Sequence, residues 1–251
     1  MIALTAGGHK LIQTAGHTFE LKPGALLVTS VEMPSSSVIM EASLENPYLG
    51  MVVELERSII ASLISEMQDK PQRTQEQEIP GAWSTEASEP ILDAFLRLAK
   101  LFHTPEHAAI LGPLVIRELH YLLLASPQGD RLRALYHSGG NGIADVITWL
   151  KQNTSSPASM PSLARMARMS ISSFHRHFKE ITGLSPLQYH KKLRLFEAQR
   201  LMLAESYRVN EAALAVGYES VTQFNREYRR LFGDAPARDI NKRRRQMSGL
   251  S

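Results

Sequence analysis

An internal repeat in the C-terminal part of the chain constrains its fold more than any other feature. Two segments that lie fifty residues apart agree at seven of seventeen positions, in identity or in side-chain type. The paired positions are Ser170 and Ser220, Phe174 and Phe224, Arg176 and Arg226, Phe178 and Tyr228, Lys179 and Arg229, Gly183 and Gly233, and Pro186 and Pro236. Agreement this dense indicates two copies of one structural unit.

Each copy has the pattern of a helix-turn-helix. A short helix of small and aliphatic residues is followed by a tight turn, a capping serine and a second helix whose aromatic residues share one face. In the first copy Ser170 caps the helix that carries Phe174. In the second copy Gly217 lies in the turn, and Ser220 and Gln223 are predicted to form a capping box. The C-terminal part is therefore predicted to be an all-α double helix-turn-helix.

The segment between the two copies is predicted to be one connecting helix. Residues 187–204 repeat apolar side chains at helical spacing, with Lys and Arg on the other face. A helix of about 18 residues is about 27 Å long. This length is comparable to the ~34 Å turn of B-DNA, so one chain could place two recognition helices in successive major grooves.

The two halves of the chain carry opposite charges. Residues 1–142 hold ten Lys and Arg against sixteen Asp and Glu, a net charge of −6, whereas residues 143–251 hold eighteen against nine, a net charge of +9. The basic half is the part that suits a polyanion. Near the charge boundary the stretch His137 to Gly142 is rich in glycine, which is typical of a linker. We therefore predict domains at residues 1–137 and 143–245, a linker at 138–142 and a tail at 246–251, with Lys242 to Arg245 as a disordered basic extension.

Residues 143–245 resemble the DNA-binding domain of the AraC/XylS family of bacterial transcription regulators. The resemblance rests on Leu-Ala-x-x-Ala-x-x-Ser at 163–170, Phe-Lys-x-x-x-Gly-x-Ser-Pro at 178–186, and Gly-Tyr-Glu-Ser followed by Phe-x-Arg and Phe-Gly-x-x-Pro within 217–236. It implies a homeodomain-like fold and sequence-specific binding of double-stranded DNA in the bacterial cytoplasm. Whether the protein activates or represses transcription stays open.

The same resemblance implies which residues touch DNA. The positions that face base edges are Ser172, His175 and Arg176 in the first recognition helix and Val221, Thr222, Asn225 and Arg226 in the second. Arginine can bond guanine with two donors, asparagine can pair with adenine, and Val or Thr can touch a thymine methyl group. Phosphate contacts are expected from Lys179, Arg229 and Arg230. Contact of Arg226 with a phosphate or an internal carboxylate is the alternative for that side chain.

The N-terminal half reads as short strands followed by helices. Strand patterns bounded by turn residues cover 11–14, 17–21, 25–30, 37–42 and 48–55. Helical periodicity begins after Glu56, is interrupted by a polar stretch at 68–88 that is predicted to be a loop, and returns at 91–102, 106–124 and 130–136. These patterns predict an antiparallel β unit at about 10–56 covered by helices at about 57–136. The overall class is α+β.

Residues 11–66 resemble the N-terminal domain of AraC-type regulators through ELKPGALLVTSVEMP and EASLENPYLGMVVELE. This resemblance implies a cupin-like fold that senses a small molecule or mediates dimerisation. Family members have further elements before the position of Leu11, so we expect an incomplete barrel with exposed strand edges, or a misassigned start codon. His9, His17, Glu41 and Tyr48 could face an effector cavity, but solvent-facing or core roles are favoured for each.

Enzymatic and metal-binding functions find little support in the sequence. The chain has no cysteine, so disulfides, thiolate zinc sites and cysteine nucleophiles are excluded. His103 and His107 flank Pro105, and His175 and His177 lie on different sides of a helix. Phosphate-binding loops, nucleophile elbows and carboxylate dyads are lacking. A metal-dependent cupin enzyme remains a remote alternative, and no cofactor is expected.

The expected partners follow from this organisation. They are double-stranded DNA, a second copy of the chain, an unidentified small-molecule effector and RNA polymerase. The apolar runs are too short to cross a bilayer and no export signal opens the chain, so a cytoplasmic location is expected. The alternative function is an effector-independent regulator whose N-terminal half is only an interaction module.

Overall fold

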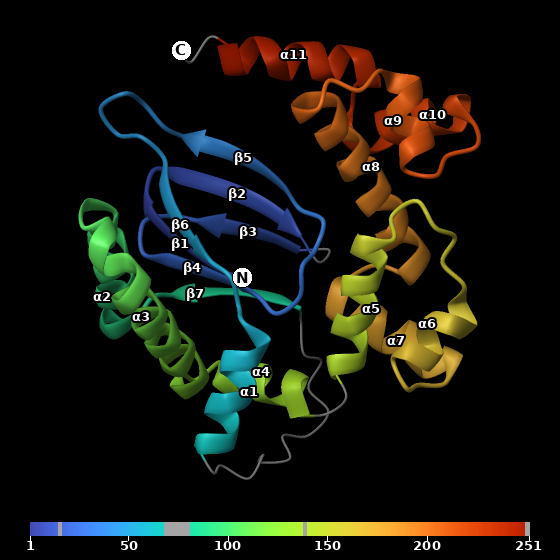
Figure 1. The fold of residues 1–251 in the computed structure, drawn as a ribbon. Coiled ribbons are helices and arrows are strands. Elements are labelled where there is room, and N and C mark those ends of the chain that lie inside the picture. Colours follow the sequence, from blue (N-terminus) through green and yellow to red (C-terminus); the bar gives the residue numbers. More distant parts are fainter. Residues whose placement is uncertain (15–16, 68–80, 138–139, 249–251) are drawn as a thin grey trace. The chain divides into compact units, whose positions relative to one another are not determined.

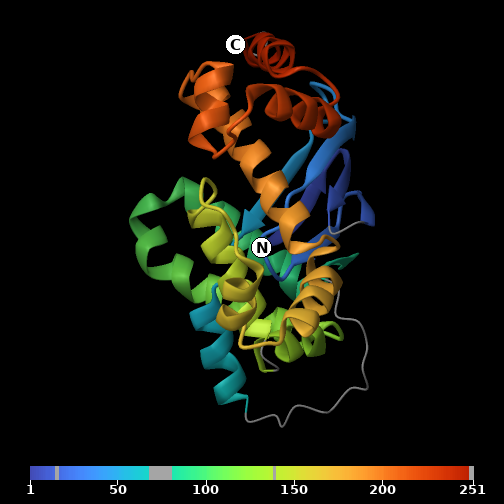
Figure 2. The ribbon, with the colours of Figure 1, turned by 90° about the vertical axis from the view of Figure 1, so that its right-hand side faces the viewer.

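The computed structural model describes residues 1–14, 17–67, 81–137 and 140–248 (Figures 1 and 2). The chain forms two compact units. One comprises residues 1–144 together with 176–184, and the other comprises residues 145–175 together with 185–251. Each unit is described by itself below.

The N-terminal strands form two antiparallel sheets. A four-stranded sheet has the order β6 (Leu49–Val53), β1 (Ile2–Gly7), β4 (Ala25–Thr29) and β7 (Ala82–Glu86). A three-stranded sheet has the order β3 (His17–Leu21), β2 (His9–Thr14) and β5 (Ser36–Glu41). The five strands predicted between residues 11 and 55 are confirmed as β2 to β6. Strand β5, at one end of the three-stranded sheet, is exposed along its whole length.

Two strands were not predicted. β1 pairs with both β4 and β6 and buries Ile2 and Leu4. β7 lies within the polar stretch that was predicted to be a loop, so that prediction is wrong for residues 82–86, while residues 68–80 lie outside the described part of the chain. Trp83 explains the strand, because it is only 4% exposed and stands in register with Val28 of β4.

Strand β4 joins the two parts of the N-terminal core because it is buried on both faces. Leu26 and Val28 pack with residues of the helices and of the four-stranded sheet. Leu27, on the opposite face, packs with Ile12 and Leu21 of the three-stranded sheet. The alternation of side chains along one strand thus connects the sheet interior with the helical cover.

The N-terminal helices are α1 (Arg57–Glu66), α2 (Glu89–Lys100), α3 (Pro105–Ala125) and α4 (Gly129–His137), with a 3-10 turn at Leu101–His103. They confirm the predicted helical segments. Ile60, Phe95 and Leu119 are fully buried against the four-stranded sheet. Helices α2 and α3 lie side by side (Figure 1).

Helix α3 is long and apolar enough to span a membrane by length and composition alone, with a mean hydropathy of 1.5. Core helices of water-soluble proteins pass the same test. In this fold α3 packs on α1, α2 and α4, and its two central charged residues form ion pairs, Arg117 with Glu66 and Glu118 with Arg97. One face of α3, with Val115, Leu119 and Leu123, therefore belongs to the N-terminal core.

The C-terminal half is helical throughout its described elements. They are α5 (Gly140–Gln152), α6 (Met160–Met166), α7 (Ile171–Thr182), α8 (Pro186–Ala204), α9 (Val209–Ala215), α10 (Val221–Phe232) and α11 (Pro236–Ser248). Helix α8 confirms the predicted connector and runs from the α5–α6 end towards α9–α11 (Figures 1 and 2). The pairs α6–α7 and α9–α10 are the two predicted helix-turn-helix units.

Two boundary predictions need correction. Residues 140–142 of the predicted linker already belong to α5, while 138–139 lie outside the described residues. Residues 246–248 of the predicted tail belong to α11. Glycine content suggested a flexible linker, but the first turn of a helix tolerates glycine because Ile143 and Val146, both fully buried, fix the helix that follows.

Candidate nucleic-acid interface

The second helix-turn-helix is built around three aromatic rings that pack edge-on or tilted against one another. Phe224 and Tyr228 of α10 are fully buried, and their ring centroids lie 5.5 Å apart. Tyr218, in the turn before α10, meets Phe224 edge-on at 5.3 Å. Gly233 ends the helix with a φ of 85°, which favours glycine. This packing fixes one face of α10 inward and leaves the opposite face free.

The N-terminus of α10 is capped by Ser220, whose hydroxyl oxygen accepts a hydrogen bond from the Gln223 backbone N–H at 3.3 Å. The reciprocal half of the predicted capping box does not form. The Gln223 side chain instead donates to the Glu227 carboxylate at 3.3 Å. The cap therefore depends on the serine alone.

The outward face of α10 carries five of the ten side chains that were predicted to contact DNA. Thr222, Asn225 and Arg226 are exposed, as are Arg229 and Arg230. Helical spacing places these five residues over one continuous surface. Val221 differs, because it is half-buried and packs against the aromatic core. Arg226 forms no ion pair with any residue that the structure describes, so its guanidinium is available to a ligand.

The first recognition helix, α7, repeats this design. Ser170 accepts a hydrogen bond from the Ser173 backbone N–H at 3.2 Å, and Phe174 and Phe178 are fully buried. Ser172 and Lys179 are exposed.

The remaining predicted residues of α7 are partly engaged within the helix. His175 is half-buried, with its ring 6.0 Å from that of Phe174. The side chain of Arg176 is 67% exposed, and its Nε lies 3.8 Å from the Glu180 carboxylate. His177 Nδ1 lies 3.0 Å from the same carboxylate. The charge of Arg176 is thus partly balanced before any ligand binds.

A cluster of polar side chains fixes α10 to the connector helix. The half-buried Glu227 accepts hydrogen bonds from the Lys191 ammonium at 2.9 Å and from the Tyr218 hydroxyl at 2.8 Å. Burial acts to raise the pKa of Glu227, but the hydrogen bonds from Lys191, Tyr218 and Gln223 lower it below its ordinary value. Burial, followed by the bond to Glu227, raises the pKa of Tyr218. Glu227 therefore stays ionised and holds α10 against α8.

Helix α11 is joined to the same core through a buried carboxylate. Asp239, 5% exposed, accepts hydrogen bonds from the Gln199 amide at 2.6 Å, the Tyr228 hydroxyl at 2.7 Å and Arg243 at 2.8 Å. Burial and the bond to Asp239 raise the pKa of Tyr228. These contacts connect α8, α10 and α11 into one body.

Known proteins resemble both halves of the chain. The family described as the AraC-type transcriptional regulator N-terminus matches residues 1–131, which is more than half of the sequence, and a helix-turn-helix domain family matches residues 163–242. The chain belongs to the AraC family. It is a DNA-binding transcription regulator, and its N-terminal domain is of the type that senses a ligand or mediates dimerisation.

Individual relatives agree with this assignment. The transcriptional regulator ExsA of Pseudomonas aeruginosa is 26% identical over 241 residues, covering 92% of this chain and 82% of ExsA. The thermoregulatory protein LcrF of Yersinia pestis is 28% identical over 150 residues, covering 59% of this chain and 55% of LcrF. Apo ToxT of Vibrio cholerae has the same fold, with a TM-score of 0.61 over 95% of this chain and 87% of ToxT at 9% identity.

The basic run of this AraC-family chain was predicted to be a disordered extension, and that prediction is wrong. Lys242 to Arg245 lie within α11. Arg243 pairs with Asp239, and Arg244 donates to the Met202 backbone carbonyl at 2.7 Å. Charge alone indicates a solvated segment. In the structure the buried Asp239 and Ile240 anchor the helix, so Arg243 and Arg244 bond groups of the protein itself.

Three of the four polar residues weighed as effector contacts are neighbours: His9 stands in register with Glu41, and a Cβ atom added to Gly8 would lie 2.8 Å from both the Glu41 carbonyl oxygen and the Tyr48 Cα. His9 is half-buried and its Nε2 lies 3.0 Å from the Glu20 carboxylate. His17 and Glu41 are exposed, and the ring of Tyr48 is covered by the Lys10 ammonium at 5.3 Å. Among the described residues, His, Asp and Glu side chains form no group of three that could hold a metal.

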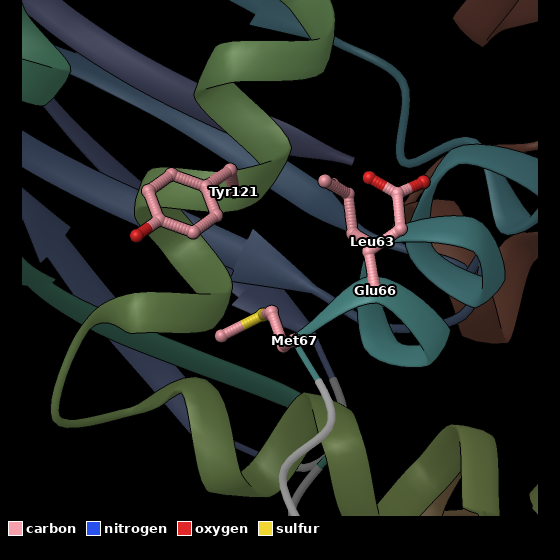
Figure 3. A pocket seen from close by; sticks show the side chains of 4 residues that line it. All are labelled: Leu63, Glu66, Met67 and Tyr121. Atoms are coloured by element: carbon pink, nitrogen blue, oxygen red, sulfur yellow. The ribbon is translucent and has the colours of Figure 1, made fainter.

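A groove between α1 and α3 is a candidate small-molecule site that sequence reasoning missed. It has a volume of about 420 Å³ and is lined by Leu63 and Glu66 of α1, by Met67 directly after that helix and by Tyr121 of α3 (Figure 3). The Glu66 carboxylate is held by Arg117 through two hydrogen bonds of 2.6 and 2.7 Å. Volumes of this size are common for small-molecule sites. Only the packing of two helices distant in sequence creates it, so periodicity could not reveal it.

Proposed function

We propose that both helix-turn-helix units of one chain bind a single DNA site, with α7 and α10 each entering a major groove. The observation that carries the proposal is the outward face of α10, where Thr222, Asn225 and Arg226 lie exposed while Phe224 and Tyr228 anchor the helix from behind. The capped, equally anchored α7 repeats the arrangement. A recognition helix needs this combination of rigid support and free polar side chains.

Base reading is assigned to the exposed polar residues of the two helices. Arg176 and Arg226 suit guanine, and Asn225 suits adenine. Thr222 and the half-buried Val221 suit a thymine methyl group, and Ser172 and His175 are less selective. Phosphate binding is assigned to Lys179, Arg229 and Arg230, which lie exposed on the same helices.

Gel-shift competition with a panel of mutated sites tests these roles. The site is first selected from random duplexes with the full-length protein. Arg176→Ala should relax the preference at one base pair and cost about 1–3 kcal/mol, whereas Arg230→Ala should weaken binding to all duplexes alike. Arg200→Ala is the matched control, because Arg200 is already paired with Glu197 and Glu205 at 2.7 and 2.9 Å. Equal losses on selected and random DNA would remove Arg176 from the base-reading set.

The N-terminal domain is proposed to form a homodimer through α2 and α3. Both helices leave large apolar side chains exposed: Leu92, Leu96, Ile110, Leu111, Leu114 and Tyr121. On α3, Ile110, Leu114 and Tyr121 share one face by their spacing. Exposed apolar stripes of this kind favour association with a like surface.

Sedimentation of the full-length chain tests the dimer. Leu114→Glu should give a monomer, because it places a charge in the apolar stripe. Leu214→Glu, at an equally exposed leucine of α9 in the other domain, should leave the dimer intact. A monomeric wild-type protein would contradict the proposal.

Effector sensing is the second proposed role, supported by the groove between α1 and α3. Thermal-shift screening of the full-length protein against metabolites should find a compound that raises the unfolding temperature. The effect should be lost in Met67→Arg, which fills the groove. An absence of any shift, together with normal DNA binding, would favour the effector-independent regulator. Contact with RNA polymerase and action in the cytoplasm are further expectations for a family member.

A further inference from the structure

One side chain of the connector helix bonds the backbone of the loop before the first helix-turn-helix and of the turn inside the second. Arg194 of α8 donates from Nε to the Thr154 carbonyl at 2.6 Å, and from Nη2 to the carbonyls of Ser156 at 3.0 Å and Ser155 at 3.4 Å. Its Nη1 reaches the Gly217 carbonyl at 3.4 Å. The planar fork of a guanidinium makes such multiple bonds possible.

The two groups of carbonyls lie in different parts of the DNA-binding half. Residues 153–156 lie in the loop that joins α5 to α6, the first helix of the first helix-turn-helix. Gly217 lies in the turn between α9 and α10 of the second. Arg194 therefore connects the loop before one unit with the turn inside the other.

The two loops approach each other closely at this point. Gly217 has a φ of 81°, and a Cβ atom added to it would lie 2.4 Å from the Ser155 carbonyl oxygen. Position 217 thus requires glycine for two reasons, the positive φ and the closeness of the α5–α6 loop. The contact is direct and leaves no room for a side chain.

Neighbouring residues of α8 also contact the α5–α6 loop and the second helix-turn-helix. His190, one turn before Arg194, hydrogen-bonds the backbone of Asn153 and Thr154, and its pKa is lowered by burial and by the charge of Arg194. Lys191 is paired with Glu227 of α10 at 2.9 Å. Arg194 lies between these contacts and reaches both the α5–α6 loop and the α9–α10 turn.

We propose that Arg194 is a positioning residue that fixes the distance and angle between the two recognition helices, and so restricts the protein to one spacing between its two half-sites. The inference rests on the proposed binding of one DNA site by both units. One inserted base pair moves a half-site by about 3.4 Å and about 34° around the duplex. A rigid pair of helices cannot follow this movement, whereas a loosened pair can.

The affinity for duplexes with a changed half-site spacing distinguishes this positioning role from a phosphate contact and from a purely structural role. The probe is a duplex selected from random sequences by the wild-type protein, together with versions that have one base pair inserted or deleted between the two protected segments. The variant is Arg194→Lys, which keeps the charge but loses the fork. The control is Arg200→Lys on the same helix, whose partners are Glu197 and Glu205.

The wild-type protein and Arg200→Lys should lose at least about 10-fold in affinity on the spacing variants. Arg194→Lys should bind the original and altered spacings within about threefold of each other, because the two units can move apart. Gly217→Ala, which forces the two loops apart while Arg194 itself is kept, should show the same tolerance and serves if Arg194→Lys fails to fold.

Discrimination by Arg194→Lys and Gly217→Ala as strong as that of the wild type would overturn the role of Arg194 while leaving two-segment binding intact. Protection of a single DNA segment by the wild-type protein would instead overturn the proposed function, and this inference with it. The two failures are therefore distinguishable from the footprint of the wild-type protein alone.

Discussion

The two recognition helices are capped and anchored in the same way but differ in the charge of their outward faces. Each is capped by a serine and anchored by two buried aromatic rings. Glu180 in α7 stands where α10 has Arg230, and it lies near both Arg176 and His177. In α10 the carboxylate of Glu227 is instead turned to Lys191 and Tyr218.

This difference in charge predicts different roles for the two helices in DNA binding. Counting Lys and Arg against Glu, α7 carries a net charge of +1 and α10 of +2. The outward carboxylate of α7 also repels phosphate, whereas that of α10 is neutralised by the connector. We therefore expect α10 to supply more of the sequence-independent affinity and α7 to depend more on base contacts.

The largest expected effect is a loss of stability that tests whether α7 and α10 depend equally on their buried phenylalanines. Phe174→Ala and Phe224→Ala each remove a fully buried ring and should each lower the free energy of unfolding by about 3–5 kcal/mol. Scanning calorimetry of the full-length variants measures the loss. Phe102→Ala, at a side chain that is 78% exposed, is the control and should change little. A clear loss for one phenylalanine only would break the comparison.

The serine caps should contribute less and again equally. Ser170→Ala and Ser220→Ala each leave a backbone N–H at a helix start without its partner, at a cost of about 1 kcal/mol. Chemical unfolding measures both variants. Replacement by threonine should retain most of the stability, since its hydroxyl can accept the same bond. A cap effect confined to α10 would show that α7 is held by other contacts.

Salt titration of DNA binding tests the charge difference between α7 and α10. Arg230→Ala should reduce the slope of log affinity against log salt by about 0.9, because one phosphate contact is lost. Glu180→Gln should strengthen binding to all duplexes at low salt without reducing that slope. Identical slopes for Arg230→Ala and the wild type would show that α10 does not supply the phosphate contacts assigned to it.

A smaller effect is expected from pH in the N-terminal domain. Burial lowers the pKa of His120, whose Nδ1 donates to the Ile116 carbonyl at 2.7 Å and whose Nε2 accepts from the Glu56 N–H at 2.9 Å. Protonation would remove that acceptor. Because the folded-state pKa lies below the unfolded value of about 6.5, the stability is complete above that pH and falls as the pH drops through the interval between the two.

Unfolding temperatures between pH 7.5 and 5.5 check the role of His120. The wild-type protein should lose stability on acidification, and His120→Gln should lose less, since an amide can accept the same bond without titrating. The exposed His103 offers the control substitution His103→Gln, which should behave like the wild type. A pH dependence unchanged in His120→Gln would contradict this explanation.

The repeat and the periodic patterns predicted most of the fold because they report local preferences. Helix α8 follows from apolar residues at helical spacing, and the strands β2 to β6 follow from strand-forming runs bounded by turn residues. Strand β7 was missed because its five residues lie in a polar stretch and pair with β4, more than fifty residues earlier in the chain. The basic run of α11 was misjudged because Asp239, the partner of Arg243, is recognisable as buried only in the folded chain.

The candidate interface shows the same limit. The resemblance to the AraC/XylS family implied the outward residues of α7 and α10. It could not show that Glu180 lies beside Arg176, that Val221 is drawn into the core, or that Arg194 reaches two loops. Each of these facts depends on how separate elements pack, and none has a signature in the spacing of residues.

Methylation protection of the selected duplex tests the central claim most directly, that one chain reads DNA with both helix-turn-helix units. The wild-type protein should protect two major-groove segments about 10 base pairs apart. Arg176→Ala should lose protection in one segment, and Arg226→Ala in the other. A single protected segment, or loss of the same segment in both variants, would contradict the account.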